Sequence, residues 1–362
     1  MSPFNDPDIT IYHDSAFEGN VLDTRPIGGV ETSEIYLSRE FAKQGRKVVI
    51  FCKCQNPGVF DGVQYLNIAD FPAFNKSNKI KIFISQTNPN IFKTQEINAN
   101  LSAFWTGGTH TVRANQPLKE KEIYSKIGKF IFKSKWQADE FVKYLGIDKQ
   151  KVFVSRNGVD LSLFKDTSVK RDRYRLIYTS TPYRGLDVLL DIFPRVRKDF
   201  PELKLYVFSD MEVYGMPKGS AMEEYKEYFK KIDQPGVFNM GNVKLKDLAR
   251  EYMKTYIHAY PSHFEETSCN AAIQAQAAGV PTITSKLAAL KETIIDNKTG
   301  KLIPGNAHSM LYKFRFINEL KKLLADEKKW KEMSSNCLER AKNYYSWEIV
   351  AKEWLEELKP YL

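Results

Sequence analysis

The chain has 362 residues, of which 43% are hydrophobic and 27% are charged, a composition typical of a globular protein long enough for two sizeable cores. No apolar run reaches the roughly 18 residues of a membrane-spanning helix, and the polar, acidic N-terminal stretch predicts no signal peptide. The formal net charge of +10 could indicate nucleic-acid binding. Because no helix-turn-helix, zinc-finger or aromatic RNA-binding signature accompanies this charge, we expect no nucleic-acid partner.

The four cysteines show no spacing that is typical of a metal site or a disulfide framework. Cys52 and Cys54 share one face of a predicted strand, and buried reduced thiols are the simplest interpretation. These features predict a cytoplasmic protein. The basic residues form an ordinary basic surface or allow peripheral contact with anionic lipid headgroups at a membrane, and both interpretations stay open.

Predicted strands and helices alternate through the first half of the chain. Strands are expected at residues 9–12, 47–52, 81–85, 103–105, 129–134 and 151–155. This alternation predicts a doubly wound α/β domain, in which ligands bind at the carboxyl ends of the strands. Gly28 and Gly29 precede the first long helix, where glycines let backbone amides approach an anion, although a simple tight turn would also use them. The three spaced glycines of a dinucleotide-binding loop are absent, so we expect no NAD.

A second polar loop follows the strand at residues 103–105 and ends in His110. At the carboxyl edge of a sheet, His110 could face a ligand, and an ordinary surface histidine is the alternative. Further on, Asn157 and Gly158 predict a turn. We place a domain boundary close to residue 165.

The second half repeats the alternation, with the first strand at residues 175–179. The next loop carries Ser180 and Thr181, whose hydroxyls can donate hydrogen bonds to phosphate. It also carries Arg184, whose planar guanidinium suits phosphate oxygens, although it could merely cap the turn. Residues 297–303 predict a hairpin-like return, and a final helix lies within residues 343–362.

Residues 259–285 predict a strand, an acidic loop, an alanine-rich helix and a further strand. Thr267 or Ser268 is a suitable N-cap, and Gly279 is a suitable helix end. The amides of residues 268–270 would then point out of the helix N-terminus, where phosphate or sugar oxygens are favoured. Glu265 and Glu266 could accept hydrogen bonds from sugar hydroxyls or simply complement the helix dipole.

This stretch resembles the signature of glycosyltransferase family 4, the retaining transferases with the GT-B fold. The family run is Pro-Ser, an acid, seven residues, a second acid and then Ala-x-Ala-x-Gly-x-Pro. Here Glu266 takes the first acid position, and Gln274 stands at the second. Three earlier segments also resemble family motifs and occur in the family's order along the chain. They are the Gly28-Gly29 loop, the stretch at residues 157–160 and the loop with Arg184.

The resemblance implies two Rossmann-like doubly wound domains that face a central cleft. Residues 1–165 would form the acceptor-side domain, and residues 166–342 the nucleotide-sugar domain. The helix in residues 343–362 would cross back to the N-terminal domain. The implied reaction moves a sugar, with retention, from a nucleotide diphosphate sugar to a hydroxyl on a glycan or related acceptor. We expect UDP- or GDP-linked donors. We expect neither a metal nor a separate cofactor.

The resemblance also implies residue roles. Glu266 would lie at the donor sugar, Gln274 at the ribose, Arg184 at the leaving diphosphate, and His110 near the sugar. The remaining donor-binding residues would be Gly28, Gly29, Ser180, Thr181, Asn242, Val243, Thr267, Ser268, Cys269 and Asn270.

Two positions depart from the family pattern. Thr179 stands where the family usually has an arginine, and Gln274 replaces an acid. Both changes remove a charge from the predicted donor site. A catalytically silent nucleotide-sugar-binding scaffold is therefore one alternative function, and a GT-B epimerase of the same fold is another.

Overall fold

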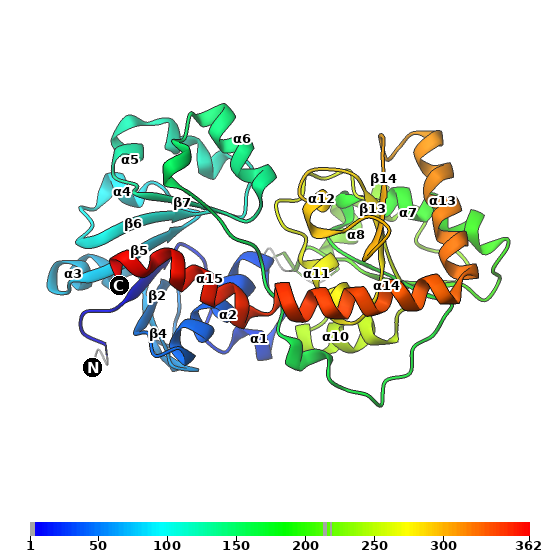
Figure 1. Cartoon of the computed structure of the whole chain (residues 1–362), viewed down its shortest axis with the longest axis horizontal. Coiled ribbons are helices and arrows are strands. Elements are labelled where there is room, and N and C mark those ends of the chain that lie inside the picture. Colours follow the sequence, from blue (N-terminus) through cyan, green and yellow to red (C-terminus); the bar gives the residue numbers. More distant parts are fainter. Residues whose placement is uncertain (1–3, 213–215, 218) are drawn as a thin grey trace. The chain divides into compact units, whose positions relative to one another are not determined.

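The computed structural model describes residues 4–212, 216, 217 and 219–362, and the chain packs into two compact units (Figure 1). Unit 1 takes in the described residues up to Val21, together with Gly29–Gly158 and Trp347–Leu362. Unit 2 takes in Leu22–Gly28 and Val159–Ser346. Each unit is an α/β structure built on one sheet, so the predicted α/β fold class is confirmed.

Unit 1 contains an eight-stranded sheet in the order β3-β4-β2-β1-β5-β6-β7-β8. Its strands are β1 (Ile9–His13), β2 (Val48–Cys52), β3 (Gly58–Phe60), β4 (Val63–Asn67), β5 (Ile80–Gln86), β6 (Ala99–Trp105), β7 (Lys129–Phe132) and β8 (Val152–Val154). All neighbours are parallel except β3, which pairs antiparallel with β4. Its principal helices are α2 (Gly29–Lys43), α3 (Phe71–Ser77), α4 (Ile91–Thr94), α5 (Lys121–Ser125), α6 (Lys135–Leu145) and α15 (Trp347–Leu358), and α1 (Val21–Thr24) spans a unit boundary.

Local sequence explains these elements. All five residues of β2, Val-Val-Ile-Phe-Cys, are buried, as expected for a parallel strand that is covered on both faces. At the start of α6, the Ser134 hydroxyl accepts a hydrogen bond from the Gln137 amide at 3.2 Å. The helix ends at Gly146, whose φ of +66° is the left-handed conformation of a helix C-terminus.

Helix α15 completes the core of unit 1 through Trp354. This side chain is buried, and its ring lies 6.1 Å from Phe41, 5.0 Å from Trp105 and 5.4 Å from Phe153, between ring centroids. Its indole N–H donates a hydrogen bond to the Ser155 hydroxyl. The last helix is therefore an integral part of this unit.

Unit 2 contains a six-stranded, fully parallel sheet in the order β11-β10-β9-β12-β13-β14. The strands are β9 (Arg175–Thr179), β10 (Lys204–Phe208), β11 (Val237–Asn239), β12 (Ile257–Tyr260), β13 (Thr282–Ser285) and β14 (Gly300–Ile303). The helices are α7 (Leu186–Arg197), α8 (Ser220–Glu224), α9 (Lys226–Phe229), α10 (Leu245–Lys254), α11 (Asn270–Ala277), α12 (Leu290–Thr293), α13 (Met310–Ala325) and α14 (Glu327–Arg340).

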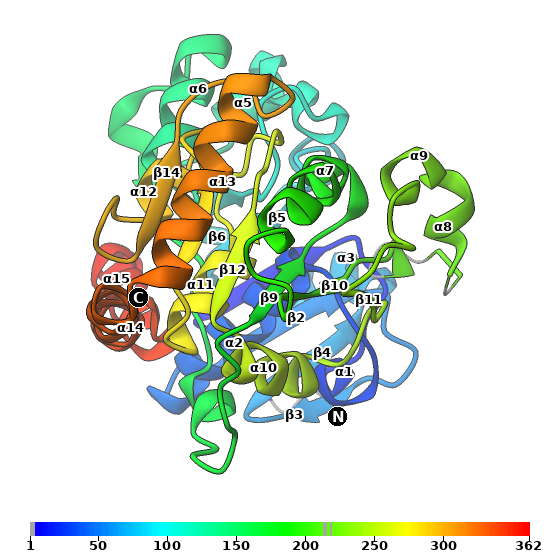
Figure 2. The same cartoon turned by 90° about the vertical axis from the view of Figure 1, so that its right-hand side faces the viewer.

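Alternate residues of β9 face two separate cores. Leu176 and Tyr178 pack in the core that includes residues of α7 and α13, and Ile177 packs in the core that includes residues of α10 and α11. Figure 2 shows α7 and α13 on one side of the strands and α10 on the other. Helices thus cover both faces, which leaves the strand ends to carry the polar loops.

The hairpin-like return predicted for residues 297–303 is wrong. β14 pairs with β13 in parallel, with Thr282 opposite Gly300 and Ser285 opposite Ile303. Helix α12 carries the chain out of β13, and a tight turn with Asn297 at φ +63° precedes β14. The turn was predicted correctly, but the strand after it, β14, pairs in parallel with β13 and is reached by a crossover connection.

None of the helices in the described part of the chain combines the length and the apolar character that crossing a membrane requires.

Candidate functional site

Two loops of unit 2 meet because their strands are neighbours. β9 and β12 pair in parallel, so both end at the same edge of the sheet. The loop after β9 carries Ser180 to Arg184, and the loop after β12 carries Glu266. This topology brings together residues that are about 80 positions apart in the sequence.

Arg184 and Glu266 form an ion pair at this edge. Arg184 Nη1 donates to Glu266 Oε1 at 3.0 Å and to Oε2 at 3.2 Å. The Tyr260 hydroxyl donates to Oε1 at 2.5 Å. The Glu266 side chain is 7% exposed and that of Arg184 is 19% exposed, so the pair is largely shielded from water. We call these three residues, with Ser180 and Phe264, the Arg184–Glu266 cluster.

The backbone holds Arg184 close to the second loop. Gly185 has φ +117°, and a Cβ atom there would lie 2.3 Å from the carbonyl oxygen of Pro261. Glycine is therefore required at this close approach. The guanidinium carbon of Arg184 lies 4.3 Å from the centroid of the Phe264 ring, a cation–π contact that fixes the side chain from another direction.

Glu266 is fixed by its backbone as well as by its carboxylate. Its amide donates to the Phe264 carbonyl at 3.0 Å, and its carbonyl accepts from the Ala289 amide at 3.0 Å. Its neighbour Glu265 is exposed. The structure thus separates the two acids that the sequence left as equal candidates for a dipole-complementing role.

Ser180 joins the cluster through its hydroxyl, which lies 3.2 Å from the Tyr260 hydroxyl. Thr181 is buried, and its carbonyl accepts a hydrogen bond from the Tyr178 hydroxyl at 2.9 Å. Among the described residues, the Thr181 hydroxyl has no hydrogen-bond partner. Burial raises the pKa of both Tyr178 and Tyr260 well above the usual value, so both phenols stay neutral donors.

The start of α11 differs from the prediction. The N-cap is Cys269, and neither Thr267 nor Ser268 holds that position. Cys269 is 2% exposed, so burial of its side chain in the core of unit 2 decides where the helix begins. Burial and the nearby Glu266 carboxylate raise the pKa of this thiol well above its usual value. Asn270 is the first helical residue, and the predicted end at Gly279 is confirmed by its φ of +67°.

Two glutamines of α11 differ in their surroundings. Gln276 is fully buried and donates to the carbonyls of Ala272 at 3.2 Å and Thr293 at 3.1 Å. Gln274 is half-buried, and its predicted contact with a ribose stays a prediction.

Asn242 and Val243 lie between β11 and α10, at the same edge of the sheet as the Arg184–Glu266 cluster. Both are half-buried, and Val243 packs against the core that contains Tyr252 and Met253. Their predicted contact with a nucleotide base stays a prediction.

Three of the predicted site residues, Gly28, Gly29 and His110, come from the part of the sequence before residue 159, where the main segment of unit 2 begins. Gly29 is the first residue of α2 in unit 1, and Gly28 ends the 22–28 segment that groups with unit 2. In unit 1, the His110 ring stacks on Tyr144 with centroids 4.3 Å apart, and His110 Nδ1 lies 3.7 Å from a Glu140 carboxylate oxygen. Helix α6 therefore orients His110, and its contact with a sugar stays a prediction.

Thr179 occupies a buried, hydrogen-bonded position. Its hydroxyl forms a hydrogen bond with the Tyr252 hydroxyl, which itself donates to the Ala271 carbonyl at 3.0 Å. Because the phenol proton goes to Ala271, Thr179 is the donor to Tyr252. The residue that departs from the family pattern here thus serves the packing of β9 against α10 and α11.

Sequence reasoning missed Tyr260 and Phe264, which hold Glu266 and Arg184 in place. Both flank the Pro261-Ser262 turn, and the signal that could have found them was an aromatic residue on either side of a predicted site loop.

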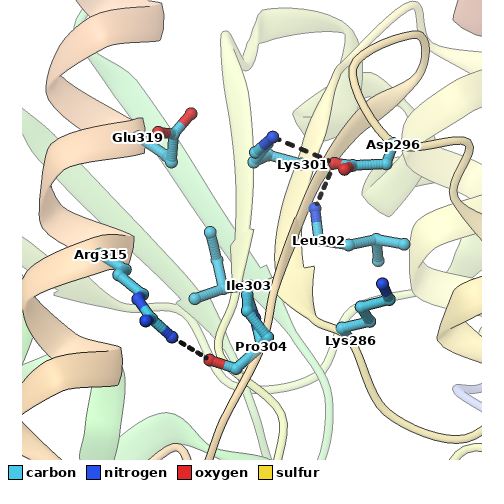
Figure 3. Close-up of a pocket in the computed structure, with 8 residues that line it drawn as sticks. All are labelled: Lys286, Asp296, Lys301, Leu302, Ile303, Pro304, Arg315 and Glu319. Atoms are coloured by element: carbon cyan, nitrogen blue, oxygen red, sulfur yellow. Dashed lines mark hydrogen bonds and ion pairs between the residues drawn. The ribbon is translucent and has the colours of Figure 1, made fainter.

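A pocket in unit 2 lies between β14 and α13 (Figure 3). Lys301 approaches an Asp296 carboxylate oxygen at 3.5 Å, and Arg315 donates to the Pro304 carbonyl at 3.3 Å. Its described lining consists of Lys286, Asp296, Lys301, Leu302, Ile303, Pro304, Arg315 and Glu319. None of these lining residues belongs to the predicted site.

Comparison with known proteins finds a family match in the second unit. The sequence model of the family described as "Glycosyl transferases group 1" matches residues 174–326, which contain the Arg184–Glu266 cluster. A lipopolysaccharide 1,2-N-acetylglucosaminetransferase of Salmonella typhimurium is 28% identical over 56% of this chain and 52% of its own length. A D-inositol 3-phosphate glycosyltransferase of Streptomyces bingchenggensis is 25% identical over 66% of this chain and 54% of its own. The chain spans about half the length of the curated relatives it matches.

Solved structures resemble the chain over nearly its whole length. A glycosyltransferase from Rickettsia africae has a TM-score of 0.71 at 15% identity and covers 98% of both chains. Anabaena Alr3699/HepE in complex with UDP-glucose has a TM-score of 0.74 at 13% identity, covering 97% of this chain and 99% of its own.

Two Rossmann-like units with parallel sheets and this likeness define a protein of the GT-B fold. The family match at residues 174–326 lies within the second unit, so this part of the chain is similar to the group 1 glycosyltransferases, also called family 4.

Proposed function

We propose that the chain is a retaining glycosyltransferase that moves a sugar from a nucleotide diphosphate sugar to a hydroxyl of a glycan or a related acceptor. The observation that carries this proposal is the Arg184–Glu266 cluster. It lies at the carboxyl edge of a parallel sheet, within the part of the chain that matches the family. Such edges are where α/β proteins bind their ligands.

The chemistry asks for charge stabilisation and positioning. The bond between the anomeric carbon and the donor phosphate breaks, and the acceptor oxygen bonds to the same face of that carbon. The departing phosphate takes the acceptor proton. Arg184 would stabilise the charge that develops on the diphosphate, and Glu266 would hold sugar hydroxyls. Both side chains are shielded from water. Electrostatic effects are stronger in such a shielded, low-dielectric site than in water.

The remaining predicted residues would complete the donor site. Ser180, Thr181 and the backbone from Thr267 to Asn270 would bind phosphate or sugar oxygens, and Gln274 would bind the ribose. Asn242 and Val243 would contact the base. Gly28, Gly29 and His110 would approach the donor from the first half of the chain.

The solved neighbour in complex with UDP-glucose supports a UDP-sugar as the first donor to test, with a GDP-sugar as the second. The relatives named for lipopolysaccharide and D-inositol 3-phosphate support a hydroxyl on a glycan or a polyol as the acceptor. We propose that transfer needs no metal at the diphosphate. We also propose that the protein works in the cytoplasm, where its basic surface allows peripheral membrane contact.

The first experiment is a thermal-shift panel with UDP, GDP, ADP, CDP and dTDP, each beside its sugar conjugates. A nucleotide at 100 times its dissociation constant stabilises the folded state by about 2.7 kcal/mol, which is readily measured. The stabilising donor is then incubated with acceptor glycans, with and without EDTA. Proton NMR of the product reads the anomeric configuration. An inverted product contradicts the retaining mechanism, and transfer that EDTA abolishes and Mg²⁺ restores contradicts metal independence at the diphosphate.

Thr179 and Gln274 favour one second candidate, a silent scaffold that binds nucleotide sugars without transferring them. Donor binding with no turnover in any acceptor panel would establish the scaffold. Interconversion of the donor sugar without an acceptor would instead establish an epimerase.

A further inference from the structure

Asp187, His263 and His308 converge in unit 2, although they come from three separate segments. Asp187 lies in the first turn of α7, His263 in the loop after β12, and His308 between β14 and α13. One ligand atom of each lies within 4.8 Å of the others. The predicted site includes none of these residues.

The ligand atoms of the three side chains lie close enough together that they could hold one metal ion. His263 Nε2 lies 3.7 Å from Asp187 Oδ1, and His308 Nδ1 lies 3.5 Å from Asp187 Oδ2. The two imidazole centroids are 4.8 Å apart. Ligand atoms bound at about 2.0–2.2 Å in a tetrahedral zinc site are separated by about 3.3–3.5 Å, so small side-chain shifts would bring all three onto one ion.

Within the described part of the chain, two of these atoms are buried without a hydrogen-bond partner. Asp187 Oδ1 and His263 Nε2 are both shielded from solvent, and their separation of 3.7 Å is too long for a direct hydrogen bond. A buried polar atom that stays unpaired destabilises the fold, and such atoms call for an explanation. An ion between them would satisfy both.

We propose that Asp187, His263 and His308 form a binding site for a divalent transition metal ion of the zinc type. Two imidazoles and one carboxylate suit Zn²⁺, Co²⁺ or Ni²⁺, whereas Ca²⁺ and Mg²⁺ prefer sites built from oxygen ligands. The His308 side chain is 52% exposed, so water can reach that side and complete the coordination.

The position of the site gives it a structural role. Asp187 follows Arg184 by three residues, and His263 precedes Glu266 by three. An ion bound by both would tie the first turn of α7 to the loop after β12, and so hold the two loops that carry the Arg184–Glu266 cluster. This role supplies no chemistry to the transfer, and the site's existence does not depend on the proposed function.

The competing explanation is that the three side chains interact with one another without a metal ion. Asp187 also suits the N-terminal turn of α7, where its charge complements the helix dipole. Although burial opposes ionisation, His263, the Val188 amide and the charge on His308 lower the pKa of Asp187. An ionised Asp187 beside the two imidazoles would then need no metal ion.

A cobalt titration of the full chain separates the two explanations. The protein is prepared without a polyhistidine tag, stripped with EDTA and dialysed. We expect one Co²⁺ per chain with visible d–d bands, displaced by Zn²⁺. The cysteines at 52, 54, 269 and 337 are all buried, so we expect no thiolate-to-cobalt charge-transfer band. Absence of binding, or a strong thiolate band, would overturn the proposal.

Substitutions locate the ion. Asp187→Asn, His263→Gln and His308→Gln should each weaken Co²⁺ binding about tenfold or more, because each removes one ligand. His110→Gln is the matched control, since His110 also lies 3.7 Å from a carboxylate oxygen but forms no three-ligand group among the described residues. Its cobalt affinity should equal that of the parent.

Folding is checked by circular dichroism for each variant. Zn²⁺ should raise the melting temperature of the parent and of His110→Gln, and this increase should vanish in the three ligand variants. If Asp187→Asn does not fold, the more exposed His308→Gln decides the question. Parent-like cobalt affinity in His308→Gln and His263→Gln would place the ion elsewhere and refute the site.

Discussion

The Arg184 guanidinium and the Glu266 carboxylate are joined by two hydrogen bonds, of 3.0 and 3.2 Å, across 82 positions of sequence. Two neighbouring strand ends make this pairing possible, and Tyr260 and Phe264 hold the partners in place. The proposed donor would therefore enter a site whose two charged groups are already oriented. Such preorganisation removes part of the reorganisation cost of the transition state.

Glu266→Gln keeps the shape of the side chain and removes its charge. We expect transfer to fall by about 100-fold or more, by analogy with the loss of one preorganised polar group in other enzymes. Because Arg184 is left without its counter-charge, unfolding should also become about 1–3 kcal/mol easier. Initial rates and urea denaturation measure the two effects. Glu265→Gln changes the exposed neighbouring acid and should leave the transfer rate and the unfolding free energy near the parent values. Equal losses of transfer in the two variants would contradict the role proposed for Glu266.

Gly185→Ala tests the close approach of the two loops. The alanine Cβ would meet the Pro261 carbonyl oxygen at 2.3 Å, so the loops must separate. Gly305→Ala is a matched control, since Gly305 has φ +113° and no atom within 4 Å of its built Cβ. Both variants incur about 1 kcal/mol for the left-handed backbone. The collision should cost Gly185→Ala a further 1–3 kcal/mol or so in urea denaturation, and similar losses would show that the loops separate freely.

Thr179→Val removes the hydrogen bond to Tyr252. Since Tyr252 keeps its bond to the Ala271 carbonyl, we expect a loss of only about 1 kcal/mol in unfolding free energy. Thr179→Arg restores the charge that is usual in the family but inserts it at a 7% exposed position. It should destabilise the fold more than valine does and should not strengthen UDP binding, as read by denaturation and calorimetry. A stable arginine variant with tighter UDP binding would show that the position faces the donor.

His258 should make stability depend on pH. The side chain is fully buried, and burial lowers its pKa to about 3. An unfolded histidine has a pKa of about 6.5, so below that value only the unfolded chain gains the proton. The contribution of His258 to the unfolding free energy is fully present above about pH 6.5 and is lost as the pH falls toward 3. About 2 kcal/mol of it is lost at pH 5.

The measurement compares unfolding free energies at pH 7.5 and 5.0 in the parent and in His258→Phe, which puts an aromatic ring without a titratable group at the position where the His258 ring contacts Tyr252 and Tyr260. The parent should lose about 2 kcal/mol more than the variant over this interval. His13 titrates in both proteins, so its contribution cancels. The same pH dependence in both would mean that His258 is protonated in the folded state.

Most of the fold could be predicted because the parallel strands are continuous apolar runs. The bounds predicted at residues 175–179 coincide with β9. β3 and β4 were not predicted; β3 has only three residues and lies at the edge of the sheet, next to β4. A signal was present in Asp61-Gly62, where both residues have positive φ, as in a two-residue hairpin turn.

The candidate site was predictable only in part. Arg184 and Glu266 were found from loop position and motif, but their direct pairing depends on the adjacency of β9 and β12, which no local pattern encodes. The same limit explains the missed cluster of Asp187, His263 and His308. The N-cap of α11 was wrong because burial of Cys269 outweighs the capping preference of the hydroxyl residues before it.

Helix α15 has a consequence for synthesis on the ribosome. The last strand of the first sheet is complete at residue 154, but Trp354, which covers Phe41 and Trp105, is made 200 residues later. At about 5–20 residues per second, that interval lasts roughly 10–40 s. Unit 2, nearly continuous in sequence, can fold first, while the nascent unit 1 exposes an aromatic surface that a chaperone would need to shield.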